Sequence, residues 1–542
     1  MSKQTEPGES GRSKELDRPL LDKTLPQGAI IIALVLALTL PRLLWLNTIL
    51  TNDEAVGGYA AMLWDQGLPP YEGTIDNKGL FYYGIYLVNI KLFGNTVTPD
   101  RLLADSLFAV SLLALYGLAR PLYGRRAALL AMLLYGFASS APILDAHLAT
   151  ADPLSMPFTV LSLFFCVRYM TSKADGHSDS FLAGLFLGIA ALIHPLRLAG
   201  IIPLGYVLSR RSLLELSGSH ARLRKRVGRP LRHALPAALG LVLPACVALL
   251  ILWHQGAAGS LVEAVRFSTS TYRDVPDVPF GHYFMIAVEA LPVWLAGALG
   301  ISLLFRSPDH RLGFVLAALL PPLVVIVGLP PRYGHKFLAL LPMVAVVGAV
   351  ALDSFLTWGC TMRSRVHVSV PLGAAGLWAA TLILWLGTVS SLWLQAKHFP
   401  DYNIRWQFVN WDWASFGSYD QQEAIAQYIK THSQASEPIF IHDNFPHIYW
   451  LSGRHAPTKN LTTYRFPGIY IPDSEYERLV EQISNQEFAY IGLHHWPPDE
   501  IMDSVRRNYL PVAAFEDDGY RFFIYARPTQ QEEASSRTLP SP

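Results

Sequence analysis

Long apolar runs, repeated along most of the chain, constrain the fold more than any other feature of the sequence. Crossing a hydrocarbon core of about 30 Å takes about 20 apolar residues in a helix. The chain is 51% hydrophobic and only 16% charged, whereas soluble domains carry about 25% charged residues. We therefore predict a polytopic α-helical membrane protein with about 11 transmembrane helices. The candidate spans are 28–46, 102–119, 127–143, 153–170, 181–194, 198–209, 234–254, 284–305, 312–328, 336–353 and 370–394.

Two of these spans, 181–194 and 198–209, are short, and the sequence His194-Pro195-Leu196-Arg197 separates them. A broken helix at membrane depth is tolerated only where protein or water covers its loose backbone groups. We therefore expect this pair of spans to line a cavity.

The distribution of Lys and Arg predicts the orientation. These residues concentrate in alternate loops, above all in the run at 222–232, and cytoplasmic loops carry such an excess. The N-terminus is therefore predicted to be cytoplasmic, with the long loops 47–100 and 255–283 outside. We interpret the basic run as a topology determinant that contacts anionic lipid headgroups. No nucleic-acid partner is expected, because the net charge is only +1.

Composition divides the chain into four regions. From about residue 395 polar residues become more frequent, and helical and strand patterns alternate as in a small α/β domain. An amphipathic helix is predicted at 421–432, with strands at 438–442, 488–493 and 520–525. The predicted regions are a disordered cytoplasmic tail (1–27), a transmembrane module (28–394), an extracytoplasmic α/β domain (395–526) and a second disordered tail (527–542).

The two long outer loops are predicted to contain helices that lie in the membrane interface. Residues 55–66 and 82–93 combine aromatic and apolar side chains at helical spacing. Tyr and Trp suit the headgroup layer because their rings are partly polar. Such helices would cover a cavity that opens at the membrane surface.

Charged residues in the first outer loop are the first candidate functional groups. The pair Asp53-Glu54 follows the first span, and ionisable groups at a membrane edge are functional by default. The alternative is that Asp53 caps the helix that follows it. Lys78 stands beside a flexible Gly79 and suits a phosphate, although a lysine that reaches toward the interface explains it equally well.

Two further motifs lie on the same side of the membrane. Asp152-Pro153 opens the fourth span, and this pair also fits an N-cap followed by a first-turn proline. Arg332, His335 and Lys336 open the tenth span, and together they can neutralise a phosphate and its leaving charge. Carboxylates and cations in converging outer loops are the layout expected for transfer from an anionic lipid carrier.

The order, sidedness and spacing of these motifs resemble the GT-C superfamily of polyprenyl-phosphate-sugar-dependent glycosyltransferases. The closest branches are the protein O-mannosyltransferases and the lipid A aminoarabinose transferase. Gly79-Leu80 departs from the relatives, which often have prolines there, and His194-Pro195 stands where many have a lysine. The segments that carry the resemblance, all within about 28–350, are Asp53-Glu54, the run from Asn77 to Tyr83, the run from Ala149 to Leu154, and Arg332-Tyr333 followed by Leu340-Leu341-Pro342.

The resemblance implies an inverting transfer of a sugar from a polyprenyl monophosphate to an acceptor hydroxyl. It assigns Asp53 as the general base, with Asp152 as a second acid at the catalytic centre. Lys78 would stabilise the leaving phosphate. The residues that the resemblance assigns to substrate binding are Glu54, Lys78, Tyr82, Arg332, Tyr333, Lys336, His194 and Arg197.

The same resemblance places the reaction on the extracytoplasmic face of a bacterial-type plasma membrane. It leaves the sugar open, and the acceptor can be a glycan, a lipid or a protein. No cofactor is assigned, although two carboxylates such as Asp53 and Asp152 would suit a divalent cation, Mg²⁺ or Mn²⁺.

Two other classes of function fit parts of the pattern. Broken spans around a cavity also occur in transporters and flippases, but the charged residues here lie in outer loops and not at mid-membrane. A non-enzymatic scaffold with an outer binding domain would make the acids incidental helix caps. A scaffold should keep its activity when Asp53 is replaced, whereas the enzyme should lose it. A transporter should move its substrate without forming a new glycosidic bond, whereas the enzyme should form one.

Overall fold

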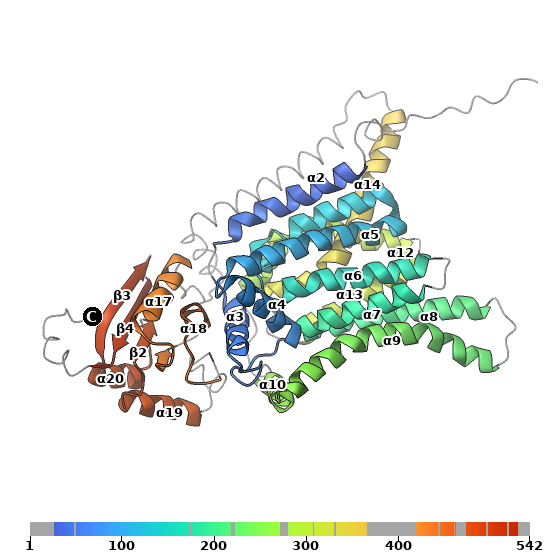
Figure 1. Cartoon of the computed structure of the whole chain (residues 1–542). Helices are drawn as coiled ribbons and strands as arrows, with labels where there is room; N and C mark the ends of the chain where they lie inside the picture. Colours follow the sequence, from blue (N-terminus) through green and yellow to red (C-terminus); the bar gives the residue numbers. More distant parts are fainter. Residues whose placement is uncertain are drawn as a thin grey trace, which may run out of the picture.

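The computed structural model contains a helical bundle with a smaller α/β domain at one end (Figure 1). It describes residues 27–47, 50–172, 176–217, 223–271, 280–306, 308–329, 332–365, 419–442, 445–459, 461, 473–494, 497–517 and 520–528. The elements of the bundle are α2 (Gln27–Thr39), η1 (Leu40–Trp45), α3 (Asn52–Asp65), α4 (Leu80–Phe93), α5 (Thr98–Ala138), η2 (Pro142–Leu144), α6 (Ala151–Thr171), α7 (His177–Ile193), η3 (Pro195–Gly200), α8 (Ile201–Ser217), α9 (Leu223–His254), α10 (Ala258–Thr271), α11 (Phe280–Glu289), α12 (Leu291–Arg306), α13 (His310–Gly328), η4 (Gly334–Ala339) and α14 (Leu341–Arg365).

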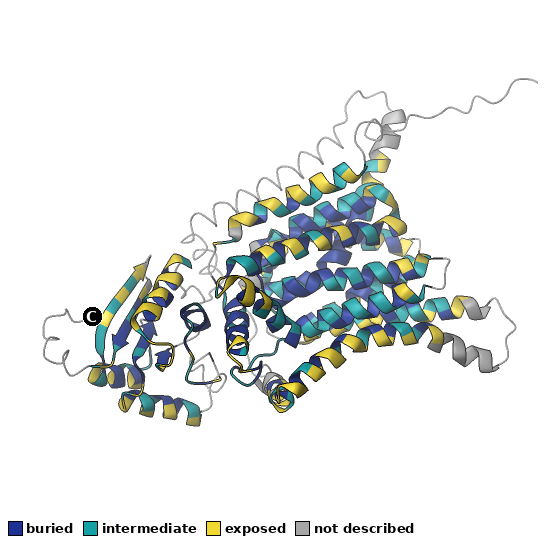
Figure 2. Ribbon diagram, in the orientation of Figure 1, coloured by how far each residue is buried: buried dark blue, intermediate teal, exposed yellow. Residues whose placement is uncertain are grey.

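The chain is a multi-pass membrane protein. Among the described residues, six helices are long and apolar enough to cross a bilayer, and three shorter apolar helices accompany them. Large apolar side chains are exposed along the outer helices, such as Leu250 (68%) on α9 and Val324 (68%) on α13. Figure 2 shows this exposed stripe along α2 and α9, with buried residues gathered on the inner helices. Such surfaces are stable where lipid covers them.

The predicted spans up to residue 353 fall on helices, although their number differs from the number of long apolar helices. The predicted span 102–119 and most of 127–143 belong to the single element α5, which bends at Gly124 with a φ of +87° and ends at Ala138. The break before Arg197 lies where it was predicted: α7 ends at Ile193, and His194 is extended before η3 begins. The last predicted span, 370–394, lies outside the described residues.

Close helix packing in the bundle depends on small residues. A Cβ atom on Gly184 of α7 would lie 2.0 Å from the carbonyl oxygen of Ala237, and one on Gly240 of α9 would lie 2.1 Å from that of Phe181. In a membrane, where apolar burial gives helices little reason to associate, this close backbone approach supplies much of the attraction. The pair α7 and α9 is therefore fixed by glycine on both sides.

The α/β domain, called the outer domain after its predicted side of the membrane, is a four-stranded sheet between helices. The strand order is β1-β2-β4-β3, with β1 parallel to β2 and the other pairs antiparallel. Alternate side chains face opposite layers: Ile439 and Ile441 pack toward α17 and α18, and Phe440 packs toward α19 and α20. The elements are α17 (Tyr419–His432), β1 (Ile439–Ile441), α18 (Pro446–Ser452), α19 (Asp473–Ser484), β2 (Tyr490–His494), α20 (Asp499–Asn508), β3 (Leu510–Asp517) and β4 (Tyr520–Ala526).

The outer domain is docked on the first outer loop. The helices α3 and α4 lie at the end of the bundle that faces the domain (Figure 1), and one apolar cluster runs through all three. Gly58 of α3 packs directly against the ring of Trp450 in α18. The backbone N–H of Leu50 donates to the side-chain oxygen of Gln422 at 3.1 Å. The loop and the domain therefore share one core.

Gly58→Ala is expected to destabilise the protein by about 1–3 kcal/mol, because overpacking a filled contact forces backbone or side-chain shifts. The added Cβ would lie 2.2 Å from the indole ring of Trp450. Gly205→Ala is the matched control, since nothing lies within 4 Å of its Cβ position on α8. Thermal unfolding of the detergent-solubilised protein measures both. Equal midpoints for Gly58→Ala and the wild type would contradict the close docking.

Candidate active site

The N-terminus of α3 presents Asp53 away from the helix cap. The cap residue is Thr51, whose hydroxyl accepts from the Glu54 N–H, while the Glu54 carboxylate accepts from the Thr51 N–H at 3.3 Å. This reciprocal arrangement is a capping box. The interpretation of Asp53 as the helix cap is therefore wrong. Its side chain is 44% exposed, so its carboxylate can meet a ligand.

Lys78 lies beside Asp53. Its ammonium nitrogen is 3.5 Å from Asp53 Oδ1, donates to Asn77 Oδ1 at 3.1 Å and lies 3.8 Å from Asp76 Oδ1. The lysine side chain is only 10% exposed. A cation held among oxygen atoms at the edge of an open carboxylate can be shared with an entering anion.

Backbone contacts hold the loop that carries Lys78. The hydroxyl of Tyr82 donates to the backbone oxygen of Asp53 at 2.6 Å, and that of Tyr71 donates to the backbone oxygen of Lys78 at 2.9 Å. Gly79 donates to the backbone oxygen of Ile193 at 3.2 Å, and a Cβ there would lie 2.0 Å from the Leu192 oxygen. Tyr82 was predicted to bind substrate, and the structure places its hydroxyl on the backbone of Asp53.

Asp152 is contacted from three directions by one guanidinium and two imidazoles. Its carboxylate forms a short ion pair with Arg197, lies 3.4 Å from His194 Nε2 and lies 3.7 Å from His335 Nε2. The N-cap of α6 is Thr150, so the interpretation of Asp152 as that cap is also wrong. The carboxylate is 6% exposed. Asp152, His194 and Arg197 therefore form one buried group.

His335 and Asp145 complete the cluster; Asp145 was not predicted, and His335 was predicted only as one of three cations for a phosphate. His335 Nδ1 lies 3.7 Å from Asp145 Oδ2, and its ring stacks on that of Tyr333. Asp145 has a φ of +52°, a conformation that costs a non-glycine residue of order 1–3 kcal/mol and is concentrated at functional sites. The two side chains are 20% and 24% exposed.

The electrostatics of the cluster keep Asp53 ionised. Burial alone would raise the pKa of Asp53, but the charges of Lys78 and His335 outweigh it and hold that pKa below its usual value of 3.8. Burial alone would lower the pKa of His335, yet its bond to Asp145 and the carboxylates of Asp152 and Asp53 raise that pKa above 6.5. Burial raises the pKa of Asp145 despite the nearby imidazole.

Glu54 differs from its predicted role in substrate binding. The carboxylate is buried, and Arg101 of α5 donates to it at 2.8 and 3.0 Å. The N–H of Ala149 donates to it at 2.9 Å. Since these donors and Thr51 already occupy its oxygens, no face of Glu54 is presented to a sugar hydroxyl.

The predicted phosphate cations after α13, Arg332 and Lys336, donate to backbone oxygens. The guanidinium of Arg332 donates to the backbone oxygen of Val327 at 2.7 Å, and the ammonium of Lys336 donates to that of Leu329 at 3.2 Å. Both side chains thus bind the C-terminal end of α13, and Tyr333 stacks on His335. In the run 332–336, His335 contacts Asp152.

A divalent cation between Asp53 and Asp152 finds little support. In the part of the chain that the structure describes, no group of three or more His, Cys, Asp or Glu side chains is arranged to hold a metal ion. Asp152 is already paired with Arg197 and contacted by the two imidazoles. The residues present therefore do not fit a metal bridged by these two carboxylates.

Comparison with known proteins adds a family and several structures. A model of the dolichyl-phosphate-mannose-protein mannosyltransferases matches residues 80–223, a segment with Tyr82, Asp152, His194 and Arg197 but without Asp53 and Lys78. No curated protein matches the chain at a significant level.

ArnT from Cupriavidus metallidurans in the apo state aligns with a TM-score of 0.60 at 16% identity, over 92% of this chain and 97% of that chain. ArnT bound to undecaprenyl phosphate aligns with a TM-score of 0.58 at 14% identity, over 93% and 98%. The Archaeoglobus fulgidus oligosaccharyltransferase tethered with an acceptor peptide aligns with a TM-score of 0.51 at 11% identity, over 93% and 75%.

The chain has the GT-C fold. The predicted fold class is thereby confirmed, although the exact number of transmembrane helices is not. Because the ArnT alignment covers 92% of the chain, the likeness extends beyond the bundle into the outer domain, for which the sequence suggested no relative. In this GT-C fold the cluster around Asp53 lies at the end of the bundle that carries α3, α4 and the outer domain (Figure 1).

Proposed function

We propose that this protein is an inverting glycosyltransferase that moves a sugar from a polyprenyl-phosphate carrier to an acceptor hydroxyl. The observation that carries the proposal is the exposed, ionised Asp53 within 3.5 Å of the Lys78 ammonium, at one end of a GT-C fold. The likeness to ArnT bound to undecaprenyl phosphate supports this class of donor. The excess of Lys and Arg in alternate loops of the sequence supports an extracytoplasmic site.

In the proposed reaction the acceptor oxygen attacks the anomeric carbon and its proton passes to Asp53. The bond from that carbon to the phosphate oxygen breaks, and the electron pair leaves with the lipid phosphate. Lys78 stabilises the charge that develops on this phosphate. A single base and direct displacement give inversion, in contrast to the two-carboxylate covalent route of retaining enzymes.

Asp152 acts in this scheme as a positioning residue. Its carboxylate is buried and bound by Arg197, His194 and His335. A carboxylate so occupied is a weak proton acceptor, but it orients the imidazole of His335 next to Asp53. We propose that Arg332 and Lys336 help attract the anionic lipid without contacting the reacting atoms.

Two measurements test the proposed function directly. Purified protein in vesicles, supplied with polyprenyl-phosphate sugars and an envelope extract from a deletion strain, is expected to form a new glycosidic bond detected by mass spectrometry. The envelope glycans of that deletion strain should lack the same sugar. Movement of the lipid-linked sugar across the vesicle without bond formation would instead support a transporter.

Lys78→Ala is expected to weaken donor binding by about 10- to 100-fold, because a hydrogen bond to a charged group contributes about 1.5–3 kcal/mol. The KM for the acceptor should change little. Lys91→Ala is the control, since Lys91 is an exposed lysine of the same loop that pairs with Asp65 at 2.6 Å. Binding of radiolabelled polyprenyl phosphate gives the readout. Equal affinity in the wild type and Lys78→Ala would contradict the phosphate role.

His335→Gln is expected to change the pH profile of transfer. The wild-type imidazolium is present below its raised pKa and is lost as the pH rises through that value, above 6.5, so activity should fall on the alkaline side. The variant should lose this decrease in activity at alkaline pH. Its decrease at acid pH should begin at a higher pH, because the charge of His335, which lowers the pKa of Asp53, is then absent. Transfer rates measured across a range of pH test this expectation, with His432→Gln on α17 as control. A pH profile of His335→Gln identical to that of the wild type would rule out the electrostatic coupling between His335 and Asp53.

A further inference from the structure

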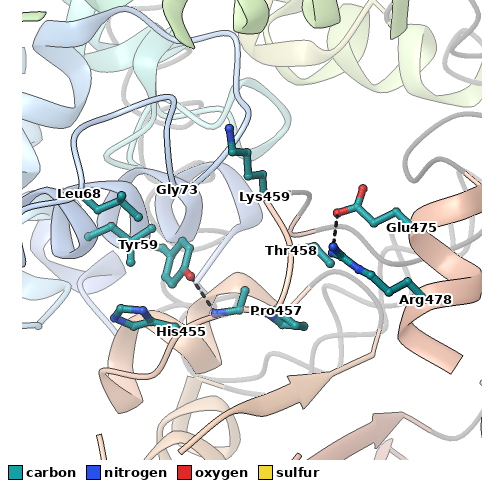
Figure 3. A pocket seen from close by; sticks show the side chains of 11 residues that line it. Tyr59, Leu68, Gly73, His455, Pro457, Thr458, Lys459, Glu475 and Arg478 are labelled. Atoms are coloured by element: carbon teal, nitrogen blue, oxygen red, sulfur yellow. Dashed lines mark hydrogen bonds and ion pairs between the residues drawn. The ribbon is translucent and has the colours of Figure 1, made fainter. Parts of the chain in front are cut away.

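A hollow of about 400 Å³ lies between the first outer loop and the outer domain, outside the cluster around Asp53. Its walls come from α3 and the turn after it, from the segment that follows α18, and from α19. Figure 3 shows Tyr59 and Leu68 on the loop side, His455 and Lys459 on the domain side, and Arg478 on α19. The proposed reaction uses none of these residues.

Hydrogen bonds between the loop and the domain hold this hollow open. The N–H of Ala456 donates to the Tyr59 hydroxyl at 2.8 Å, as the dashed line in Figure 3 marks. A ring nitrogen of His455 lies 2.5 Å from the Gln66 side-chain oxygen, and the N–H of Ile75 donates to the backbone oxygen of Lys459 at 3.1 Å. A site whose walls are already tied requires little ordering when a ligand binds.

The lining combines an apolar floor with a polar rim. The apolar lining includes Leu68, which is 37% exposed, and Tyr59, which is almost wholly buried. At the rim, Arg478 lies 4.0 Å from Glu475, and Lys459 lies 3.6 Å from Glu263 of α10, which is not itself part of the lining. Each pair offers N–H donors beside carboxylate acceptors.

This chemistry favours a neutral carbohydrate over an anion. A sugar presents apolar C–H faces together with hydroxyl groups that donate and accept, which matches the floor and the paired rim. A phosphate or a carboxylate would have to displace Glu475 or Glu263 from a cation that is already neutralised. The rim pairs are partly exposed and therefore remain able to exchange partners with hydroxyl groups.

The position of Tyr59 on α3 sets the length of the occupant. Asp53 and Tyr59 are six residues apart on this helix, which is about 9 Å along its axis and places them on different faces. A single sugar that fills the hollow therefore cannot also reach Asp53. A chain of several sugars is long enough to span this distance and place a terminal hydroxyl at the carboxylate.

We infer that this hollow is a distal subsite for a neutral, extended carbohydrate acceptor. The inference rests on the proposed glycosyltransferase function, because it names the acceptor class of the same reaction. It gives the outer domain a role in the reaction, since the segment 455–459 and α19 form two of the three walls.

Binding to the full chain tests the subsite without turnover. The Asp53→Asn protein, in detergent, is incubated with neutral oligosaccharides released from the deletion strain's envelope and separated by length, and the bound fraction is measured by equilibrium dialysis. Longer fractions should bind more tightly than single sugars. When Lys459→Ala and Arg478→Ala are introduced together into the Asp53→Asn protein, binding of the longer fractions should weaken about tenfold, a loss of about 1.4 kcal/mol. Arg507→Ala on α20, an exposed arginine outside the hollow, should have no effect.

Three outcomes would overturn the subsite: no oligosaccharide binds, the rim variants bind as well as their parent, or only acidic glycans bind. Polyprenyl phosphate binding by the same proteins is measured in parallel. If the protein binds oligosaccharide at the rim but no polyprenyl phosphate, the proposed reaction is rejected and the carbohydrate site is retained. Normal donor binding with no oligosaccharide binding would remove the subsite alone.

Discussion

Asp53→Asn is expected to reduce sugar transfer by about 10²- to 10⁴-fold, the usual contribution of a positioned general base. Asparagine keeps the shape of the side chain but cannot take the acceptor proton. The cap of α3 is formed by Thr51 and Glu54, so the substitution leaves the helix start intact. The side chain is 44% exposed, and we expect the unfolding midpoint to change by no more than surface variants do.

The matched control is Asp65→Asn. Asp65 ends the same helix and forms an exposed pair with Lys91 at 2.6 Å, so its loss removes a carboxylate of α3 without reaching the cluster. Transfer is measured in vesicles with the lipid donor in excess, and donor binding is measured separately. Wild-type transfer by Asp53→Asn would exclude the general-base role. Loss of donor binding with an unchanged turnover rate would move Asp53 from proton transfer to donor recognition.

The membrane architecture could be predicted from the sequence because a bilayer imposes a length and a polarity on each span. The interruption at His194 and the outer sheet could also be predicted from short stretches of sequence. A proline interrupts a helix locally, and alternating apolar residues indicate a strand within a few positions. Strand β3 was missed. It contains Pro511 and two alanines and pairs through a bulge between Pro511 and Ala513, so it lacks the β-branched pattern by which strands are identified.

The site could be predicted only in part, because sequence spacing does not say which of two adjacent acids faces a cavity. Asp53 and Glu54 are neighbours in sequence but point about 100° apart on the helix, one toward Lys78 and the other toward Arg101. His335 was grouped with Arg332 and Lys336 as a phosphate cation, yet η4 turns it toward Asp152. Asp145 carried no signal at all, because its left-handed backbone is visible only in three dimensions.

The other large effect is expected at Glu54, for a structural reason. Glu54→Ala should destabilise the protein by about 3–5 kcal/mol, the usual cost of removing one partner of a buried ion pair. The side chains of Glu54 and its partner Arg101 are each about 1% exposed. Glu54 also accepts from the N–H of Ala149. The loss of its carboxylate therefore affects α3, α5 and the start of α6 together. Thermal or denaturant unfolding in detergent measures the change, and Asp65→Ala at the surface should cost no more than about 1 kcal/mol.

The double variant Glu54→Leu with Arg101→Met separates this structural role from a catalytic one. Replacing both charges with apolar groups removes the stranded guanidinium, and such replacements of buried pairs are often neutral or stabilising. We therefore expect the double variant to recover most of the stability lost in Glu54→Ala and to retain transfer while Asp53 is present. A stable double variant without transfer would instead return Glu54 to substrate binding. Recovery of both stability and transfer would support Asp53 as the catalytic carboxylate of the pair, with Glu54 stabilising the start of the helix that carries Asp53.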